Sequence, residues 1–194
     1  MNTPTLETER LILRQFTEDD LEALFLILKD EEVNKFLPWY PMKNLEETKK
    51  FYEERYAAKY NESQAYAYAI CLKDDDVPAG YINITVDDSY ELGYGLRKEF
   101  WHQGIVSEAA KAVAEQVKKD GIPYITATHD INNPHSGGVM RKIGMKYQYS
   151  YEERVQPKNM LVIFRMYQLN FDGNEDFVYK KYWDMHDNHF VENL

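Results

Sequence analysis

Residues 91–109 read Glu91-Leu-Gly-Tyr-Gly-Leu-Arg-Lys-Glu-Phe-Trp-His-Gln-Gly-Ile-Val-Ser-Glu-Ala109, and this stretch predicts a strand, a polar turn and a helix in direct succession. The strand ends at Leu96, and the helix opens at Gly104, which allows close backbone approach. The N–H groups in the first turn of a helix have no acceptors within it, and the helix dipole adds positive potential there. We therefore predict an anion site built from backbone alone. The alternative is an ordinary strand-to-helix turn that contains a glycine.

On the C-terminal side of this turn, apolar residues recur every four positions and predict an amphipathic helix over about 104–120. A strand at 122–128 follows, and then a short helix that Gly144 ends in the left-handed conformation. Residues 145–154 and 160–169 predict a hairpin.

On the N-terminal side, a strand at 10–14 precedes two helices. Thr17 and Asp20 form a capping box at the start of the first helix, and Asn44 caps the second. Between the helices, Phe36-Leu-Pro-Trp-Tyr-Pro41 predicts an aromatic loop. Three strands then form an antiparallel meander, at 66–72, 78–86 and 90–96.

The order of these elements indicates an α+β protein with three αβα layers around a mixed, mostly antiparallel central sheet. We expect residues 1–170 to form one domain and residues 171–194 to form an acidic, helical C-terminal extension. The extension carries six acidic side chains and two lysines. It could cover its own domain or a second subunit, so a homodimer is one expected assembly.

The composition excludes several classes of function. The chain has 194 residues, 23 Lys and Arg against 33 Asp and Glu, and a net charge of −10. Such acidity argues against nucleic-acid backbones and anionic membranes as partners. The single cysteine, Cys71, excludes an intrachain disulfide and alternates with apolar neighbours in a way that predicts a core position. Residues 1–16 lack an apolar signal core, and no apolar run approaches transmembrane length, so we expect a cytoplasmic protein.

Three stretches of the chain carry a recognisable pattern in order and spacing. They are Leu6-Glu-Thr-Glu-Arg-Leu-Ile-Leu-Arg14, then Glu91-Leu-Gly-Tyr94 through Trp101-His-Gln-Gly-Ile-Val-Ser-Glu-Ala109, and then Asn133-Pro-His-Ser136 with Lys142-Ile-Gly-Met145. They resemble the opening strand, the acetyl-CoA pyrophosphate loop and the following helix of the GNAT N-acetyltransferase family. The likeness is to the subgroup of ribosomal-protein N-terminal (RimJ/RimL-like) acetyltransferases, over about residues 6–170.

The resemblance implies that the fourth and fifth predicted strands, 90–96 and 122–128, splay apart and admit the pantetheine arm of acetyl-CoA. It implies direct transfer of an acetyl group to an amine, with no covalent enzyme intermediate and no metal. Backbone N–H groups at Gly95 and Leu96 would meet the oxyanion. The implied cofactor-binding residues are Gly95, Leu96, Arg97, His102, Gln103, Gly104, Ile105, Val106, Ser107, Asn133, Ser136 and Lys142.

Several positions depart from the family pattern. His102 stands where the family has Gly, and Val106 where it has Gly or Ala, so both add bulk beside the loop. Met140 replaces the tyrosine that protonates the departing thiolate in many relatives, and that role then passes to Ser136. Gly137-Gly138 within the short helix is either local drift or room for the pantetheine arm.

The sequence does not identify one residue as the general base. Glu91 on the central strand is the first candidate, because partial burial would raise its pKa. Glu153, and then Glu152, are rivals, because the subgroup places an acid on that strand. His129 at the end of a strand is a further candidate, with a structural role as its alternative.

The acceptor is expected to be a primary amine, on a small molecule or at a peptide N-terminus. Trp39 and Tyr40 of the aromatic loop, with Tyr94, are the candidate substrate-binding residues, and packing on the second helix is the alternative for the loop aromatics. The main expectation is therefore an acetyl-CoA-dependent N-acetyltransferase. The second hypothesis, based on Met140, His102 and Val106, is a non-catalytic acyl-CoA-binding or regulatory module on the same fold.

Overall fold

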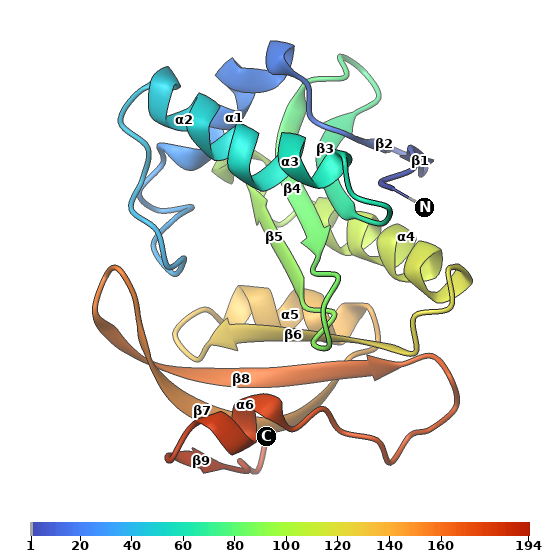
Figure 1. The fold of residues 1–194 in the computed structure, drawn as a ribbon, viewed down its shortest axis with the longest axis vertical. Coiled ribbons are helices and arrows are strands. Elements are labelled where there is room, and N and C mark those ends of the chain that lie inside the picture. The colour runs from blue at the N-terminus through green and yellow to red at the C-terminus, as the bar shows by residue number, and fades with distance from the viewer. Residues whose placement is uncertain (1) are drawn as a thin grey trace.

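Two antiparallel sheets make up the framework of the computed structural model, which describes residues 2–194 (Figure 1). The first sheet has the order β1-β2-β3-β4-β5, and the second has the order β6-β8-β7-β9. The strands are β1 (Leu6–Glu7), β2 (Leu11–Arg14), β3 (Tyr66–Leu72), β4 (Pro78–Ile84), β5 (Leu92–Leu96), β6 (Tyr124–Asp130), β7 (Lys146–Val155), β8 (Met160–Asn170) and β9 (His189–Phe190).

The helices cover the sheets from both sides. They are α1 (Leu21–Leu28), α2 (Leu45–Tyr52) continued by a π turn (Glu53–Ala57) and α3 (Ala58–Tyr60), α4 (Ile105–Lys119), α5 (Pro134–Lys142) and α6 (Lys181–Met185). The predicted caps are confirmed, since the Asn44 side chain accepts from the Glu47 N–H at 2.9 Å and Gly144 has a φ of +92°. Leu45, in the first turn of α2, is 39% exposed.

Strand alternation divides the first sheet between two cores. Leu11, Leu13 and Ile82 point to one face, where they pack against α4 residues such as Val113. The opposite face packs against α1 and the α2–α3 segment, and Cys71 lies in this second core with no exposed surface. Burial raises the pKa of its thiol to about 12, so the predicted core role of Cys71 is confirmed. The helices and sheets thus build the expected layers.

The two sheets meet at a single parallel bridge between Glu91 and Thr126, where the Thr126 N–H donates to the Tyr90 carbonyl at 3.2 Å. Beyond this bridge, no strand within residues 2–194 pairs with the outer edge of β5 or of β6. The expected splaying of these two strands is therefore confirmed, and their free edges face a wedge-shaped opening. Their parallel bridge also makes the combined sheet mixed, as predicted.

The C-terminal segment, residues 171–194, packs on the second sheet of its own chain (Figure 1). The sequence predicted a helix here, but only Lys181–Met185 is helical, and β9 adds a two-residue strand beside β7. The reason is that aromatic side chains of the segment lie across the face of β7 and β8, which an extended backbone follows better than a helix. No helix in residues 2–194 has the length and apolar character to cross a bilayer.

Candidate active site

The turn after β5 is held by two side chains. The Trp101 indole N–H donates to the Leu96 carbonyl at 2.7 Å, so the turn folds back on the end of its strand. Arg10 donates to the Gln103 carbonyl at 3.0 Å and pairs with Glu108 of α4 at 2.7 Å. These contacts fix the backbone that leads into α4.

The N-terminus of α4 is open. Gly104 occupies the N-cap position with a φ of +76°, and no side chain in residues 2–194 caps this helix. Its first-turn residues are the buried Ile105 and the partly exposed Val106 and Ser107. Val106 packs against the core, so its extra bulk does not lie over the loop. The predicted anion site therefore has free N–H groups, as the chemistry requires.

His102 also adopts a left-handed conformation, with a φ of +61°, and its side chain is exposed. Its ring lies edge-on to that of His135 in the first turn of α5, with centroids 4.9 Å apart. Two helix N-termini, those of α4 and α5, are therefore brought to the same region. Arg97 instead turns toward Glu99 and the Phe100 ring.

Tyr94 links β5 to α5 across the opening between the sheets. Its hydroxyl donates to the Ser136 carbonyl at 2.8 Å and lies 2.9 Å from the Ser136 hydroxyl. The Asn133 side chain accepts from the Ser136 N–H at 3.4 Å and caps this helix. Lys142 lies at the other end of α5, about 9 Å along the axis from Ser136, and is exposed.

Tyr94 lies apart from Trp39 and Tyr40, the other two candidate substrate-binding residues. Residues alternate across a strand, so Tyr94 shares the α4 side of β5 with Leu92 and Leu96. Trp39 packs against the core on the opposite side of the sheet. The structure therefore places Tyr94 beside Ser136 and away from the aromatic loop.

Gly137 and Gly138 have different surroundings. A Cβ atom on Gly137 would lie 2.6 Å from Nε2 of the buried His129, whereas Gly138 has open space around its Cα. The first glycine is therefore required by packing and the second is not. Met140 is buried in the core, so it offers nothing to a departing thiolate.

Glu91 is a partly buried carboxylate. It lies at the bridge to Thr126, which is the closed end, or apex, of the wedge-shaped opening between β5 and β6. Its Oε1 accepts from the Thr128 hydroxyl at 2.6 Å, and its Oε2 accepts from the Tyr182 hydroxyl at 3.1 Å. Burial raises the pKa of Glu91 above its ordinary value, and the two hydrogen bonds oppose that rise. Glu91 also alternates with Leu92, so it shares the α1–α2 side of β5 with Gly93 and Gly95, over which the Asn83 and Tyr81 side chains of β4 lie.

The rival bases have other contacts. Glu153 is 41% exposed at its side chain and lies 3.9 Å from His186 Nε2. Glu152 is partly buried, and its backbone N–H donates to Asn188 beside β9. His129 is buried with Nδ1 against the Asp130 carbonyl, and desolvation lowers its pKa. Its position beneath Gly137 favours the structural role.

The aromatic loop is organised around Asn34, which has no exposed surface. The Trp39 indole donates to the Asn34 side chain at 3.0 Å, and Trp39 packs edge-on to Phe51 of α2. Arg55 lies over both rings. Tyr40 is 59% exposed, so the structure separates the two aromatic residues that the sequence grouped.

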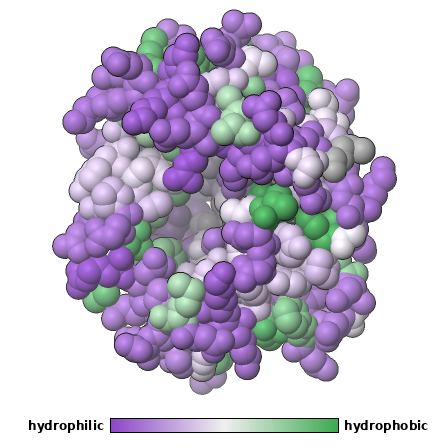
Figure 2. All heavy atoms as spheres, viewed as in Figure 1, coloured by the Kyte–Doolittle hydropathy of each residue, from purple (hydrophilic) through white to green (hydrophobic). Residues whose placement is uncertain are grey.

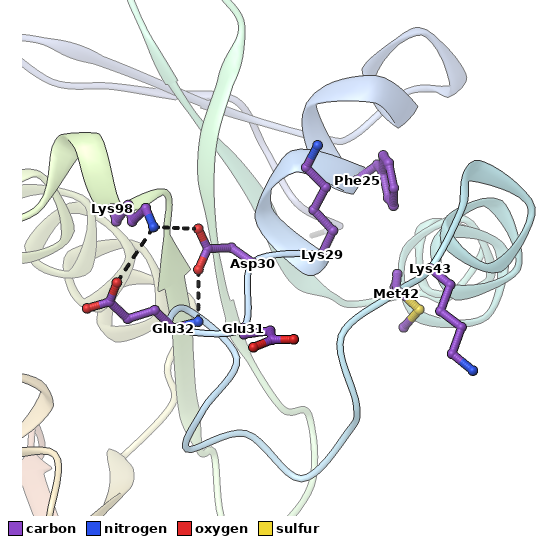
Figure 3. Close-up of a pocket in the computed structure, with 8 residues that line it drawn as sticks. All are labelled: Phe25, Lys29, Asp30, Glu31, Glu32, Met42, Lys43 and Lys98. Carbon is purple, nitrogen blue, oxygen red and sulfur yellow. Dashed lines mark hydrogen bonds and ion pairs between the residues drawn. The ribbon is translucent and has the colours of Figure 1, made fainter.

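Two lysines join this loop to the rest of the chain. Lys158, in the hairpin between β7 and β8, donates to the Asn34 carbonyl at 2.8 Å and to the Lys35 carbonyl at 3.3 Å. Lys98 reaches Asp30 at 3.4 Å and Glu32 at 3.6 Å (Figure 3). The viewed face is hollowed beside β5, between this loop and the second sheet (Figure 2).

A separate, open hollow of about 470 Å³ lies between the start of the same loop and the turn after β5 (Figure 3). Charged side chains and Phe25 and Met42 line it. None of the predicted site residues contributes to it. We therefore place the site at the wedge.

Sequence reasoning missed Arg10, Thr128, Lys158 and Tyr182. Each acts on a residue between 37 and 124 positions away, so no local pattern marks it. Arg10 lies within a stretch that carried the family pattern, and that position was the one available signal.

Comparison with known proteins places this geometry among acetyltransferases. The sequence model of the acetyltransferase (GNAT) domain matches residues 10–146. The uncharacterized N-acetyltransferase YoaA of Bacillus subtilis (strain 168) is 30% identical over an alignment of 161 residues. The alignment covers 77% of this chain and 89% of that protein.

Two solved structures share the fold. RimL, a ribosomal L7/L12 alpha-N-protein acetyltransferase in complex with coenzyme A, aligns with a TM-score of 0.77 and 22% identity over 88% of this chain and all of that one. The microcin C7 self-immunity acetyltransferase MccE, in complex with acetyl-CoA and AMP, aligns with a TM-score of 0.73 and 19% identity over 84% of this chain and 93% of that one.

Proposed function

The chain belongs to the acetyltransferase (GNAT) family, and from this premise we propose that it moves an acetyl group from acetyl-CoA to a primary amine, with Glu91 as the general base. The acceptor is the α-amine of a protein N-terminus or a small amine. The observation that carries the proposal is the position of Glu91, a carboxylate with hydrogen-bonded oxygens at the apex of the opening between β5 and β6.

The residues around the opening fit acetyl-CoA. The uncapped α4 N-terminus supplies backbone donors for a pyrophosphate, so a chain of net charge −10 needs few lysines to bind this anion. The unpaired edges of β5 and β6 offer backbone groups to the amides of a pantetheine arm. Open space at Gly138 leaves room beside that arm.

Acetyl-CoA supplies the acetyl group as a thioester, whose sulfur leaves as a thiolate. Glu91 takes the proton from the attacking amine, and its raised pKa makes it a stronger base than an ordinary glutamate. The Ser136 hydroxyl, which lies 2.9 Å from that of Tyr94, turns to donate its proton to the leaving sulfur, while Tyr94 keeps its bond to the Ser136 carbonyl. The backbone N–H of Leu96 stabilises the oxyanion, because the N–H of Gly95 points to β4 in the register of these two strands.

The acceptor enters by the hollow beside β5. Lys158 bridges the outer side of this hollow, so a slender chain end or a small amine fits better than the side of a folded protein. The acidic surface also attracts a cationic amine before it loses its proton.

The test is thiol release from acetyl-CoA in the presence of a broad panel of small amines and peptides. We expect turnover with at least one class of acceptor. Tight binding of coenzyme A with no turnover on any amine would instead support the non-catalytic acyl-CoA-binding module.

The role of Glu91 is tested separately. Glu91→Gln should lower kcat/KM by more than about tenfold, since general-base catalysis contributes roughly 100- to 10,000-fold. A smaller loss excludes Glu91 as the essential base, and Glu153→Gln in the same assay then identifies or dismisses the rival.

A further inference from the structure

We propose that Tyr182, in the C-terminal segment, is a positioning residue that orients the Glu91 carboxylate and keeps it ionised for the reaction. This inference rests on the proposed function of Glu91. It gives residues 171–194, which lie beyond the match to the family model at 10–146, a direct part in the chemistry of the site.

The geometry starts from the two oxygens of the carboxylate. Thr128 of β6 donates to one at 2.6 Å, and Tyr182 of α6 donates to the other at 3.1 Å. The two donors come from different elements, strand β6 and the C-terminal segment that packs on the second sheet. With both hydrogen bonds in place, rotation of the carboxylate about its last side-chain bond is restricted. Without Tyr182, the second oxygen has no hydroxyl donor among the described residues.

The ring of Tyr182 is held in place by other rings. It stacks on Tyr151 of β7 at a centroid distance of 5.4 Å and an interplanar angle of 26°. It also packs edge-on to Tyr179 at 5.4 Å. The hydroxyl of Tyr182 therefore reaches Glu91 from a fixed platform rather than from a mobile tail.

The segment is anchored on both sides of Tyr182. Before it, the Tyr179 N–H donates to the Gln168 side chain at 2.8 Å, and Lys181 pairs with Asp88 at 3.0 Å. After it, Glu192 forms a two-point ion pair with Arg165, with bonds of 2.9 and 2.6 Å. Asp88 lies in the turn just before β5, so the segment is tied to the strand that carries Glu91.

The charged and titratable groups that face Glu91 come from several elements. Asp87 in the β4–β5 turn and Glu153 on β7 both disfavour its ionised form. Tyr151 on β7 stays neutral because burial raises its pKa, and it carries no charge toward Glu91. Thr128 and Tyr182 are the groups that favour the carboxylate. Loss of either donor should therefore make Glu91 hold its proton to higher pH.

The experiment is the pH profile of kcat/KM for the full-length chain and for Tyr182→Phe, which keeps the ring and removes the hydroxyl. We expect the acid limb to move up by about 0.5 to 1 pH unit, with the rate on the high-pH plateau little changed. The matched control is Tyr179→Phe, because its hydroxyl bonds to Asp88 at 3.1 Å in the same segment. That variant should leave the acid limb where it is.

A second variant and a second readout keep the test independent of folding and of catalysis. Thr128→Val removes the other donor and should move the limb in the same direction. The Glu91 carboxyl can also be titrated by carbon NMR, with Glu91→Gln used to assign its signal, and the Tyr182→Phe titration should move up by the same amount.

The outcomes separate the two proposals. An acid limb and an NMR titration that stay in place in Tyr182→Phe overturn the role of Tyr182, whatever Glu91 does. A profile whose acid limb survives in Glu91→Gln overturns Glu91 as the base, and the NMR titration still decides whether Tyr182 sets its ionisation. A shift that Tyr179→Phe reproduces equally also overturns the specific role of Tyr182.

Discussion

The ammonium group of Lys158 donates a hydrogen bond over 2.8 Å to the backbone carbonyl of Asn34, which lies 124 residues earlier in the chain. Asn34 in turn orders its own loop, because its side-chain amide donates to the carbonyls of Ile27 and Asp30 and its oxygen accepts from Trp39. A single lysine thus connects the hairpin of the second sheet to the loop on the acceptor side of the first.

Replacement of this lysine should change acceptor binding. Lys158→Met removes a charged donor to two carbonyls, a contribution of about 1–2 kcal/mol, so KM for the acceptor should rise roughly five- to thirtyfold. KM for acetyl-CoA should stay the same, because the bridge lies on the acceptor side. Steady-state kinetics with each substrate varied in turn checks this. Lys146→Met is the control, since Lys146 is exposed and pairs only with Glu175. Equal KM values for the acceptor in all three proteins would contradict the prediction.

The two adjacent glycines of α5 should respond in opposite ways to the same substitution. Gly137→Ala places a methyl group 2.6 Å from the His129 ring and should cost about 1–3 kcal/mol of unfolding free energy. Gly138→Ala meets open space and should stabilise the helix by about 0.5–1 kcal/mol. Urea denaturation of both variants measures the difference. A Gly137→Ala protein as stable as the parent would mean that His129 can move aside.

The stability of Glu91→Gln should depend on pH in a defined direction. The folded-state pKa of Glu91 is raised above its ordinary value of 4.5, so folding favours the protonated form. The stability that this group contributes is present below its ordinary pKa and is lost as pH rises through the folded value. The uncharged variant should therefore gain stability relative to the parent as pH rises from the ordinary pKa of 4.5 through the folded-state value.

Thermal melting of both proteins across this range measures that trend. Glu31→Gln, at an exposed position of the α1–α2 loop, is the control for simple loss of a surface charge. A difference in Tm between Glu91→Gln and its parent that narrows with rising pH would contradict the assignment.

Removal of the C-terminal segment should destabilise the second sheet. Tyr149, Tyr151 and Met166 pack beneath the segment, and a chain that ends at Leu169 would expose these apolar side chains to water. We expect a lower Tm and self-association, which light scattering would detect. Met185→Ser is the control, because Met185 is 65% exposed within the same segment. A monomeric truncated chain with the parental Tm would show that the segment is dispensable for folding.

Local sequence signals predicted much of the framework. The recurrence of apolar residues every four positions predicted α4, the Asn44 cap predicted the start of α2, and Gly144 predicted the end of α5. Each of these signals depends only on residues that are neighbours in the chain. The opening between β5 and β6 followed from the family pattern around Gly104.

The contacts that shape the site could not be predicted from the sequence, because they join residues that are far apart in the chain. Thr128 and Tyr182 meet Glu91 only after two sheets and a terminal segment have assembled. The path of residues 171–194 is set by the aromatic face of the second sheet, and their own sequence lacks a helical period long enough to predict it. The side of β5 that Tyr94 occupies was within reach, because its alternation with Glu91 and Gly93 already separated it from the acceptor face.

The bridge between Glu91 and Thr126 has a mechanical consequence. Where two rigid plates join along one short seam, a change in the angle between them displaces each atom in proportion to its distance from that seam. Glu91 sits on the seam and would hardly move, whereas the hairpin tip at Lys158 would swing through the widest arc. The hydrogen bonds of Lys158 to the Asn34 and Lys35 carbonyls therefore hold the opening at the point where an unrestrained rim would move farthest, while the carboxylate at the bottom keeps its alignment.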